Sequence, residues 1–308
     1  MSENEPEGEA RQASATASSE REQLQSLERI ESGGIPLAAE RRLRGLGERG
    51  GSFTSDLSVS DFALCDQLGL RPLSQVMGSS IYQVGFQSMP WPSRASGGFM
   101  FELQTLSEAW NDVRTRALDR LAQEAAHVGA DAVLGMDLRT GEHDWAESSI
   151  EYLVVGTAVR HGKAQRPRGG APVLSEISVA DYAKLAQAGV EPLGIVAWSS
   201  VFFVAASYST QMLNAFSFSQ NQELGEFTQG IYSARETVVQ RISAQAASLG
   251  ASGVIGVRIS HGIQRTAGGG GLYERGGLMM TFHAIGTAIR EPAQAPSFTP
   301  KTILDLAG

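Results

Sequence analysis

A segment in which a long amphipathic helix turns through one glycine into a buried strand occurs twice in this sequence. Its two occurrences span 125–136 and 246–257, with the turn glycine at Gly129 and Gly250. A left-handed backbone at such a turn favours glycine, because a residue with a Cβ atom costs about 1–2 kcal/mol there. The repeat predicts that the chain contains two modules built on one plan.

Matching segments extend this repeat over most of the chain. Residues 55–62 match 175–182, and Gly156-Thr157-Ala158 matches Gly286-Thr287-Ala288. In both long helices the apolar residues recur every three or four positions and form one stripe. The stripes consist of Trp110, Val113, Ala117, Leu121, Ala125 and Val128, and of Ile231, Ala234, Val238, Ile242, Ala246 and Leu249. We expect an α+β fold of two tandem two-layer modules, each with a small, mostly antiparallel sheet packed on one long helix.

Composition suggests where the modules begin and end. The first residues are rich in Glu, Ser and Gly and cannot bury enough apolar surface to order themselves, whereas 163–172 has the prolines and glycines of a linker. The expected division is a disordered or partly helical N-terminal arm (1–50), a first module (51–162), the linker (163–172), a second module (173–292) and a C-terminal tail (293–308).

Helices are expected in the arm at 20–31 and 36–46. The second of these carries Arg41, Arg42 and Arg44, although the protein as a whole is acidic. These arginines form either a solvated helix face or a surface that docks on acidic groups.

Charge and cysteine content exclude several classes of function. The net charge of -8 and the pI near 5.2 argue against nonspecific nucleic-acid binding, which requires a basic face. No apolar run reaches the roughly 18 residues needed to span a bilayer, and the acidic N-terminus is unlike a signal peptide. The single cysteine, Cys65, excludes an internal disulfide and suits a reducing cytoplasm. We therefore expect a cytoplasmic protein with no membrane span and no nucleic-acid partner.

Several local features have specific expected roles. Ser107 is a candidate N-cap of the first long helix, and Gly78 is expected to mark a bulge or bend in a strand at 70–86. The pairs Ser79-Ser80 and Ser199-Ser200 occupy matching strand positions and either accommodate a bulge or line a pocket. Cys65 lies among apolar residues of a short helix, where an inert core thiol competes with a ligand or redox sensor.

The run from the long helix through Gly129-Ala130-Asp131 to Gly156-Thr157-Ala158 resembles the YbjQ-like family, which is described as a heavy-metal-binding domain of unknown function. The resemblance covers about 55–160 and 175–290. It implies a small α+β fold, related to dodecin-like subunits, that closes into rings, typically pentamers. The chain is therefore expected to form a homo-oligomer, with a ring as one form. Because members usually carry one module, the tandem arrangement leaves the stoichiometry open.

The densest cluster of potential metal ligands is Glu142, His143 and Asp144, in a polar turn expected at 139–149. No CxxC, HxxxH or HExxH spacing accompanies it. Three such side chains on one turn can hold a divalent ion, and a solvated charged turn explains them equally. His127, in the last turn of the long helix, suits that helix end as a cation. Its counterpart is Ser248, so the two modules do not share it.

No signature of an enzyme is present. The sequence lacks GxSxG, and the glycine run at 268–271 is not followed by the Lys-Ser/Thr of a P-loop. The sequence favours a noncatalytic oligomeric scaffold or binding module without a resident cofactor. The alternatives are a metal-responsive protein that uses the hairpin carboxylates and histidines, with a divalent metal ion as its cofactor, and an uncharacterised enzyme.

Overall fold

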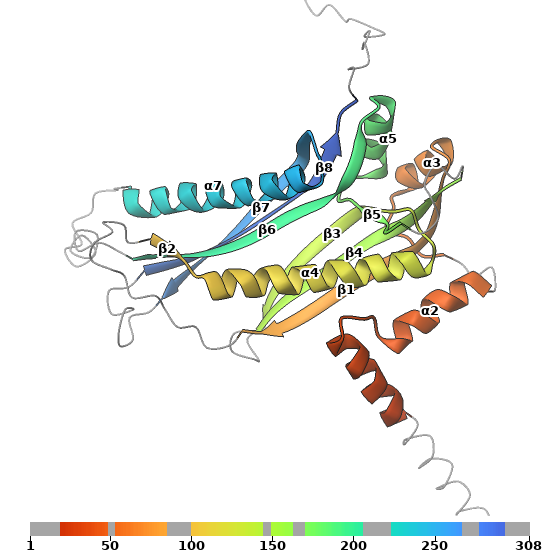
Figure 1. Ribbon diagram of the computed structural model, residues 1–308, viewed down its shortest axis with the longest axis horizontal. Coiled ribbons are helices and arrows are strands. Elements are labelled where there is room, and N and C mark those ends of the chain that lie inside the picture. Colours follow the sequence, from red (N-terminus) through yellow and green to blue (C-terminus); the bar gives the residue numbers. More distant parts are fainter. Residues whose placement is uncertain are drawn as a thin grey trace, which may run out of the picture.

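The computed structural model describes residues 19–48, 53–84, 100–143, 149–162, 170–205, 223–266 and 277–292. Within them the chain forms two four-stranded sheets (Figure 1), with strand orders β1-β4-β3-β5 and β2-β6-β8-β7. The strands are β1 (Leu70–Gln83), β2 (Met100–Glu102), β3 (Ala132–His143), β4 (Ser149–His161), β5 (Val173–Leu174), β6 (Glu191–Ala205), β7 (Gly253–Thr266) and β8 (Gly277–Arg290). All paired strands are antiparallel except β5, which is parallel to β3. The expected α+β class is confirmed.

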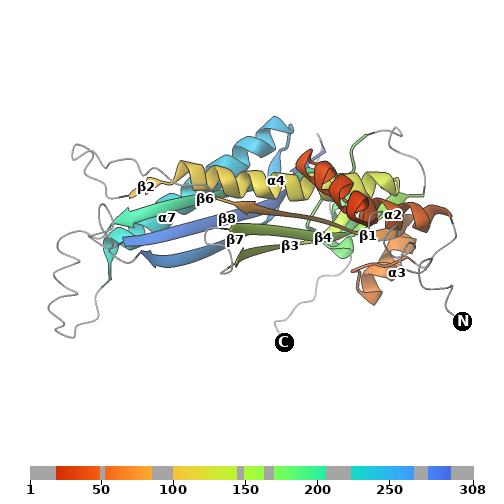
Figure 2. The ribbon, with the colours of Figure 1, turned by 90° about the horizontal axis from the view of Figure 1, so that it is seen from below.

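The helices are of two lengths. A helix over 19–31 is followed by the short helices α2 (Leu37–Glu48), α3 (Val59–Gln67) and α5 (Val179–Gln187) and by the 24-residue helices α4 (Gln104–His127) and α7 (Gly225–Ser248). Both long helices run along the same side of the sheets (Figure 2). None of the helices in the described ranges is long and apolar enough to cross a membrane.

The glycine turns have the predicted conformation. Gly129 and Gly250 have φ angles of 69° and 70°. At the first turn, the N–H of Ala130 donates to the carbonyl of Ala125 over 2.9 Å, which closes the helix in the six-to-one pattern of a Schellman motif. The apolar stripe of α4 packs against β1 and β4, and that of α7 against β6 and β8. The prediction is wrong for Leu249, which lies just beyond α7 and is 43% exposed.

The two modules exchange short strands. β2 precedes α4 in the chain but pairs with β6 of the second sheet. β5 begins the second module but pairs with β3 of the first sheet. As a result α4 lies between β1 of one sheet and β6 of the other (Figure 1) and contacts both.

The N-terminal arm packs on the C-terminal half of α4 (Figure 2). Arg120 of α4 donates to the carbonyls of Ile30 and Gly34, and Arg42 of α2 pairs with the buried carboxylate of Glu124 over 3.0 Å. Of the two alternatives for the arginines of α2, docking on an acidic group applies to Arg42. Arg41 and Arg44 instead pair with Glu22 and Glu40 inside the arm.

Two expectations about strand irregularities are wrong. β1 continues straight through Gly78, and its register shifts at Pro72/Ser74 instead. Gly78 is required because α4 approaches β1 closely there: a Cβ atom would lie 1.9 Å from the carbonyl oxygen of Ala117. The serine pairs mark no bulge either, since the register of β6 shifts at Pro192/Gly194.

Several predicted element boundaries also change. Ser107 does not cap α4, which begins at Gln104; its Oγ contacts β6. β3 extends to His143, so the expected turn at 139–149 is shorter. α2 extends to Glu48, two residues beyond the predicted end.

Candidate functional site

The modules meet along the edge of β6, and α4 supplies the side chains that satisfy that edge. The N–H of Val201 donates to Ser107 Oγ over 2.9 Å. The N–H of Ser199 donates to Asn111 Oδ1 over 3.0 Å, and the Asn111 amide donates to the Ser199 carbonyl over 2.8 Å. Unpaired strand edges attract other strands, and here side chains of a helix occupy the edge instead.

Arg114 lies one helical turn beyond Asn111 in α4 and is buried in the same junction. Its guanidinium donates to Asn111 Oδ1 over 2.7 Å and to Ser199 Oγ over 3.3 Å. Burial lowers the pKa of Arg114, while the nearby Tyr152 opposes this shift. Within the described part of the chain no carboxylate forms an ion pair with Arg114, so neutral oxygens stabilise its charge.

His283 of β8 completes this buried cluster. Its Nδ1 lies 2.8 Å from Ser199 Oγ and 3.3 Å from the hydroxyl of Tyr152, and its ring meets that of Trp110 edge-on with centroids 4.7 Å apart. Burial, and secondarily the charge of Arg114, lower the pKa of His283 to about 4. The imidazole is therefore neutral near pH 7.

The Ser199–His283 contact lacks two properties that nucleophilic catalysis requires. Ser199 is fully buried, so no substrate can reach its hydroxyl. The described residues also place no carboxylate on the other nitrogen of His283, where a catalytic histidine is normally oriented. The cluster is a polar network that joins two modules. Burial has the opposite effect on Tyr152: it raises the pKa of this side chain, so the hydroxyl stays protonated.

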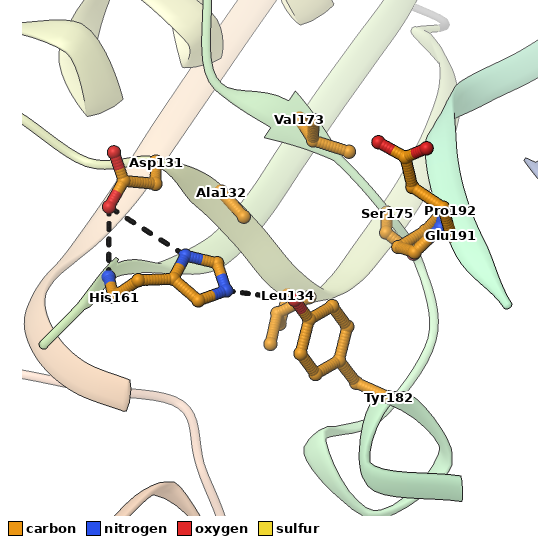
Figure 3. A pocket seen from close by; sticks show the side chains of 9 residues that line it. All are labelled: Asp131, Ala132, Leu134, His161, Val173, Ser175, Tyr182, Glu191 and Pro192. Atoms are coloured by element: carbon orange, nitrogen blue, oxygen red, sulfur yellow. Dashed lines mark hydrogen bonds and ion pairs between the residues drawn. The ribbon is translucent and has the colours of Figure 1, made fainter. Parts of the chain in front are cut away.

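A second feature of the junction is a cavity of about 290 Å³ between β3, β5, β6 and α5 (Figure 3). Its polar side chains face each other across the opening, with Asp131 and His161 on one side and Glu191 on the other. The backbone N–H of His161 donates to Asp131 Oδ2 over 2.8 Å, and His161 Nε2 lies 2.9 Å from the hydroxyl of Tyr182. The lining consists of Asp131, Ala132, Leu134, His161, Val173, Ser175, Tyr182, Glu191 and Pro192.

The chemistry of this cavity is limited. Ser175 Oγ is buried and lies 3.0 Å from Thr287 Oγ1, so it is not an accessible nucleophile. Among the described residues no group of three or more His, Cys, Asp or Glu side chains is arranged to hold a metal ion. The cavity is at the lower limit of the roughly 300–1,000 Å³ typical of small-molecule sites.

The structure leaves the predicted metal cluster untested. Glu142 and His143 are the last residues of β3, but their side chains, and the whole of Asp144, lie outside the described residues. His127 Nε2 is 3.6 Å from Glu40 Oε1 of the arm, a contact that the sequence did not indicate. Cys65 is a core thiol as predicted: it is buried, and burial raises its pKa, as does the charge of Asp61.

Sequence reasoning missed the residues that join the modules. Asn111 and Arg114 lie beside the apolar stripe of α4, where polar side chains are normally solvated. Tyr152 and His283 belong to strands of different modules, so their contact has no sequence signature. One signal in the sequence is the Ser199-Ser200 pair in the middle of a strand: Ser199 is the centre of the cluster, which is a buried network rather than the expected bulge or pocket.

Comparison with known proteins identifies the fold family. Residues 94–162 and 184–290 match the family described as "Putative heavy-metal-binding" (YbjQ). A protein of Mycobacterium tuberculosis named encapsulin nanocompartment protein is 34% identical over 275 residues, which cover 88% of this chain and 97% of that protein.

Two shorter relatives match one part of the chain each. A UPF0145 protein of Halobacterium salinarum is 43% identical over 58 residues, 19% of this chain and 54% of its own length. A UPF0145 protein of Clostridium novyi is 33% identical over 93 residues, 30% of this chain and 85% of its own length. With two matched regions that together span more than half of its length, the chain belongs to the YbjQ-like family.

Proposed function

We propose that this chain is a noncatalytic building block that assembles with further copies of itself, with the modules 51–162 and 173–292 as its units. The observation that carries this proposal is that α4 is covered on two sides, whereas its counterpart α7 is covered on one. α4 packs against both its own sheet and β6 of the other module, whereas within the described residues the main contacts of α7 are with strands of its own sheet.

The contact of α4 with the other module involves its N-terminal half, where the two helices differ in exposure. Asn111 of α4 is 9% exposed, whereas Tyr232, at the matching position of α7, is 65% exposed. Arg114 is buried, whereas its counterpart Arg235 is exposed. A large aromatic side chain so exposed on a helix that has a covered twin is typical of a contact surface.

β1 presents a sheet surface of the kind that would complete such a contact. The face of β6 that packs on the first module includes Val201, which is fully buried. The matching residue of β1 is Ile81, which is 54% exposed. The chain therefore has an uncovered face on α7 in the second module and an uncovered face on β1 in the first. A helix face and a sheet face of these two kinds meet at the internal junction, where α4 packs on β6. Surfaces of this kind join copies head to tail.

The relative from Mycobacterium tuberculosis supports assembly in a general way. Its name describes a protein of a nanocompartment, and the similarity extends over 97% of its length. The serine hydroxyls of the Ser199–His283 contact and of the cavity are both buried, which supports a noncatalytic role.

Mass measurement in solution tests the proposal. The chain has a mass of 32.8 kDa, and sedimentation or light scattering is expected to give a multiple of it. Ile81→Glu is expected to reduce the multimer, because it places a charge on the uncovered face of β1. Leu24→Glu is the matched control, since Leu24 is equally exposed (60%) but lies on the arm. A monomer for the unmodified protein at micromolar concentration would contradict the proposal.

A second candidate function is the binding of a divalent metal ion by Glu142, His143 and Asp144. The family description favours it, and carboxylates with one imidazole suit a divalent ion. Titration of zinc, copper and nickel into chelator-stripped protein is expected to show binding that His143→Ala and Asp144→Ala remove and His261→Ala leaves unchanged. Binding weaker than about 10 μM, or binding unaffected by the first two substitutions, would reject this function.

A further inference from the structure

We infer that residues 53–57 of one chain pair with the outer edge of β7 in another chain, and that Arg71 of the first chain faces Glu291 of the second. This inference rests on the self-assembly proposed above and specifies its contact. It follows from the internal junction, in which the corresponding segment of the second module already makes this contact with β3.

In the internal contact β5 pairs in parallel with β3, and the residues after β5 then hydrogen-bond to a β-bulge of β3. The N–H of Val173 donates over 3.0 Å to the carbonyl of Asp131, just before β3, and the N–H of Ser175 donates over 3.0 Å to the carbonyl of Val133 in β3. Beyond them β3 shifts register between Leu134 and Asp137. There Gly135 N–H donates to the carbonyl of Ile177 over 2.9 Å. Residues 173–177 thus satisfy an edge that is interrupted by the bulge.

β7 has the same bulge with an open edge. Its register shifts between Ile255 and Arg258, and Gly256 has a φ of 64°, as Gly135 has a φ of 62°. In the described part of the chain β7 pairs with β8 alone and ends its sheet. Met136, within the bulge of β3, is 2% exposed, whereas the matching Val257 is 42% exposed. Edges as long as this are normally covered in stable proteins.

A buried polar atom lies at this same open edge. Glu176 Oε1 has no hydrogen-bond partner among the described residues, while Glu176 Oε2 accepts from Arg258 over 2.7 Å. A Cβ atom on Gly256 would lie 3.2 Å from Glu176 Oε1. Unsatisfied buried oxygens are uncommon in folded proteins, so this part of β7 is incomplete in the single chain.

Residues 53–57 are the matching donor segment. They correspond to 173–177 by the repeat that aligns Ser55 with Ser175. They also attach to their own sheet in a similar way: Asp56 N–H donates to Thr157 Oγ1, and Ser175 Oγ contacts Thr287 Oγ1. Phe53, the first residue of this segment, stacks on Phe62 with ring centroids 5.7 Å apart, and both side chains are partly exposed. The carbonyl of Thr54 accepts from the N–H of Gln75 in β1, and within the described residues no second strand pairs with the other side of this segment.

Charges on the two surfaces are complementary. Arg71 and Arg160 are directly opposite each other in β1 and β4, a like-charged pair. At the matching positions of the second module, Glu191 lies 3.5 Å from Arg290. In the internal cavity Glu191 and His161 line the same space. By the repeat, Arg71 matches Glu191 and Glu291 matches His161. Where two chains meet in the same way, Arg71 of one chain and Glu291 of the other take these positions, and their charges are opposite.

Charge reversal tests the predicted pairing. Arg71→Glu and Glu291→Arg are each expected to weaken assembly at least about tenfold in sedimentation, and the double variant is expected to return to within about threefold of the natural chain. Glu28→Arg, at an exposed position of the N-terminal arm, makes the same charge change as Glu291→Arg away from both proposed contact surfaces and is the control for a general effect of charge. Restoration by the double variant distinguishes a direct contact from a loss of folding.

A cross-link provides an independent test of strand register. Val173 is the Cα partner of Ala132, so Phe53 of one chain is expected opposite Gly253 of another. The variant with Phe53→Cys and Gly253→Cys should form covalent dimers and larger species on oxidation, whereas Phe53→Cys with Gly262→Cys should not. A natural chain that is monomeric would overturn the proposed assembly itself. A multimer that ignores both charge reversals and gives no Phe53/Gly253 cross-link would overturn only this contact.

Discussion

The backbone N–H of Ser199 on β6 donates a 3.0 Å hydrogen bond to the side-chain oxygen of Asn111 on α4, and the amide of Asn111 donates back to the carbonyl of Ser199. A single side chain thus replaces a neighbouring strand at this residue. The same oxygen accepts from buried Arg114. One amide group therefore connects β6, α4 and the buried Arg114 at the junction between the modules.

Asn111→Ala is expected to lower the free energy of unfolding by about 2–4 kcal/mol, because it leaves the N–H and carbonyl of Ser199 buried without partners. Urea denaturation at a fixed chain concentration measures the change. Asp112→Ala, at the exposed neighbouring position of α4, is the control and should cost less than about 0.5 kcal/mol. Equal effects of the two substitutions would contradict the bridging role of Asn111.

The buried histidine gives the protein a predictable loss of stability in acid. The folded protein lowers the pKa of His283 to about 4 from an ordinary 6.5, so between these values the unfolded chain binds more protons. The stabilisation is complete above pH 6.5 and is lost as the pH falls towards 4. The integrated loss is about 3 kcal/mol.

Unfolding measured between pH 7 and pH 4 tests this expectation. His283→Gln should remove the His283 part of the pH slope, while His261→Gln, at an exposed position of β7, should keep the slope of the natural chain. An identical pH dependence for His283→Gln and the natural chain would show that His283 is not the group that titrates.

Sequence patterns predicted those features that depend on local geometry. The apolar stripes, the left-handed turn glycines and the buried Cys65 follow from helix periodicity and steric rules. The junction does not follow from them, because β5 has two residues and β2 three, too few to show a period. Ser107 illustrates the limit: as a serine near a helix start it satisfies the pattern of an N-cap, yet the nearby strand edge of β6 provides a buried donor that takes its hydroxyl.

Gly78 should tolerate no side chain. A Cβ atom there would meet the backbone carbonyl oxygen of Ala117 at 1.9 Å, and helix backbone cannot yield as a flexible side chain can. Gly78→Ala is expected to destabilise the protein by about 2–3 kcal/mol or more through overpacking. Gly262→Ala, at a strand position in β7 with nothing within 4 Å of the new methyl group, is the control and should have little effect. Thermal unfolding of the two variants compares them directly.

Glu124→Gln should separate the two roles of one carboxylate. Glu124 Oε2 accepts from the N–H of Met77 over 2.9 Å and pairs with Arg42 of the arm. At the matching position of α7, Gln245 Oε1 accepts from the N–H of Ala197 over 3.0 Å, so an amide is sufficient for the backbone contact. The negative charge is then needed only to hold α2.

The substitution is expected to leave global unfolding nearly unchanged and to speed hydrogen exchange in α2 about fivefold, equivalent to about 1 kcal/mol for an ion pair with one exposed partner. Glu236→Gln, on the exposed face of α7, should leave exchange in α2 unaltered. If exchange in α2 is the same in both variants, the arm is held by the hydrogen bonds of Arg120 to Ile30 and Gly34 rather than by the charge of Glu124.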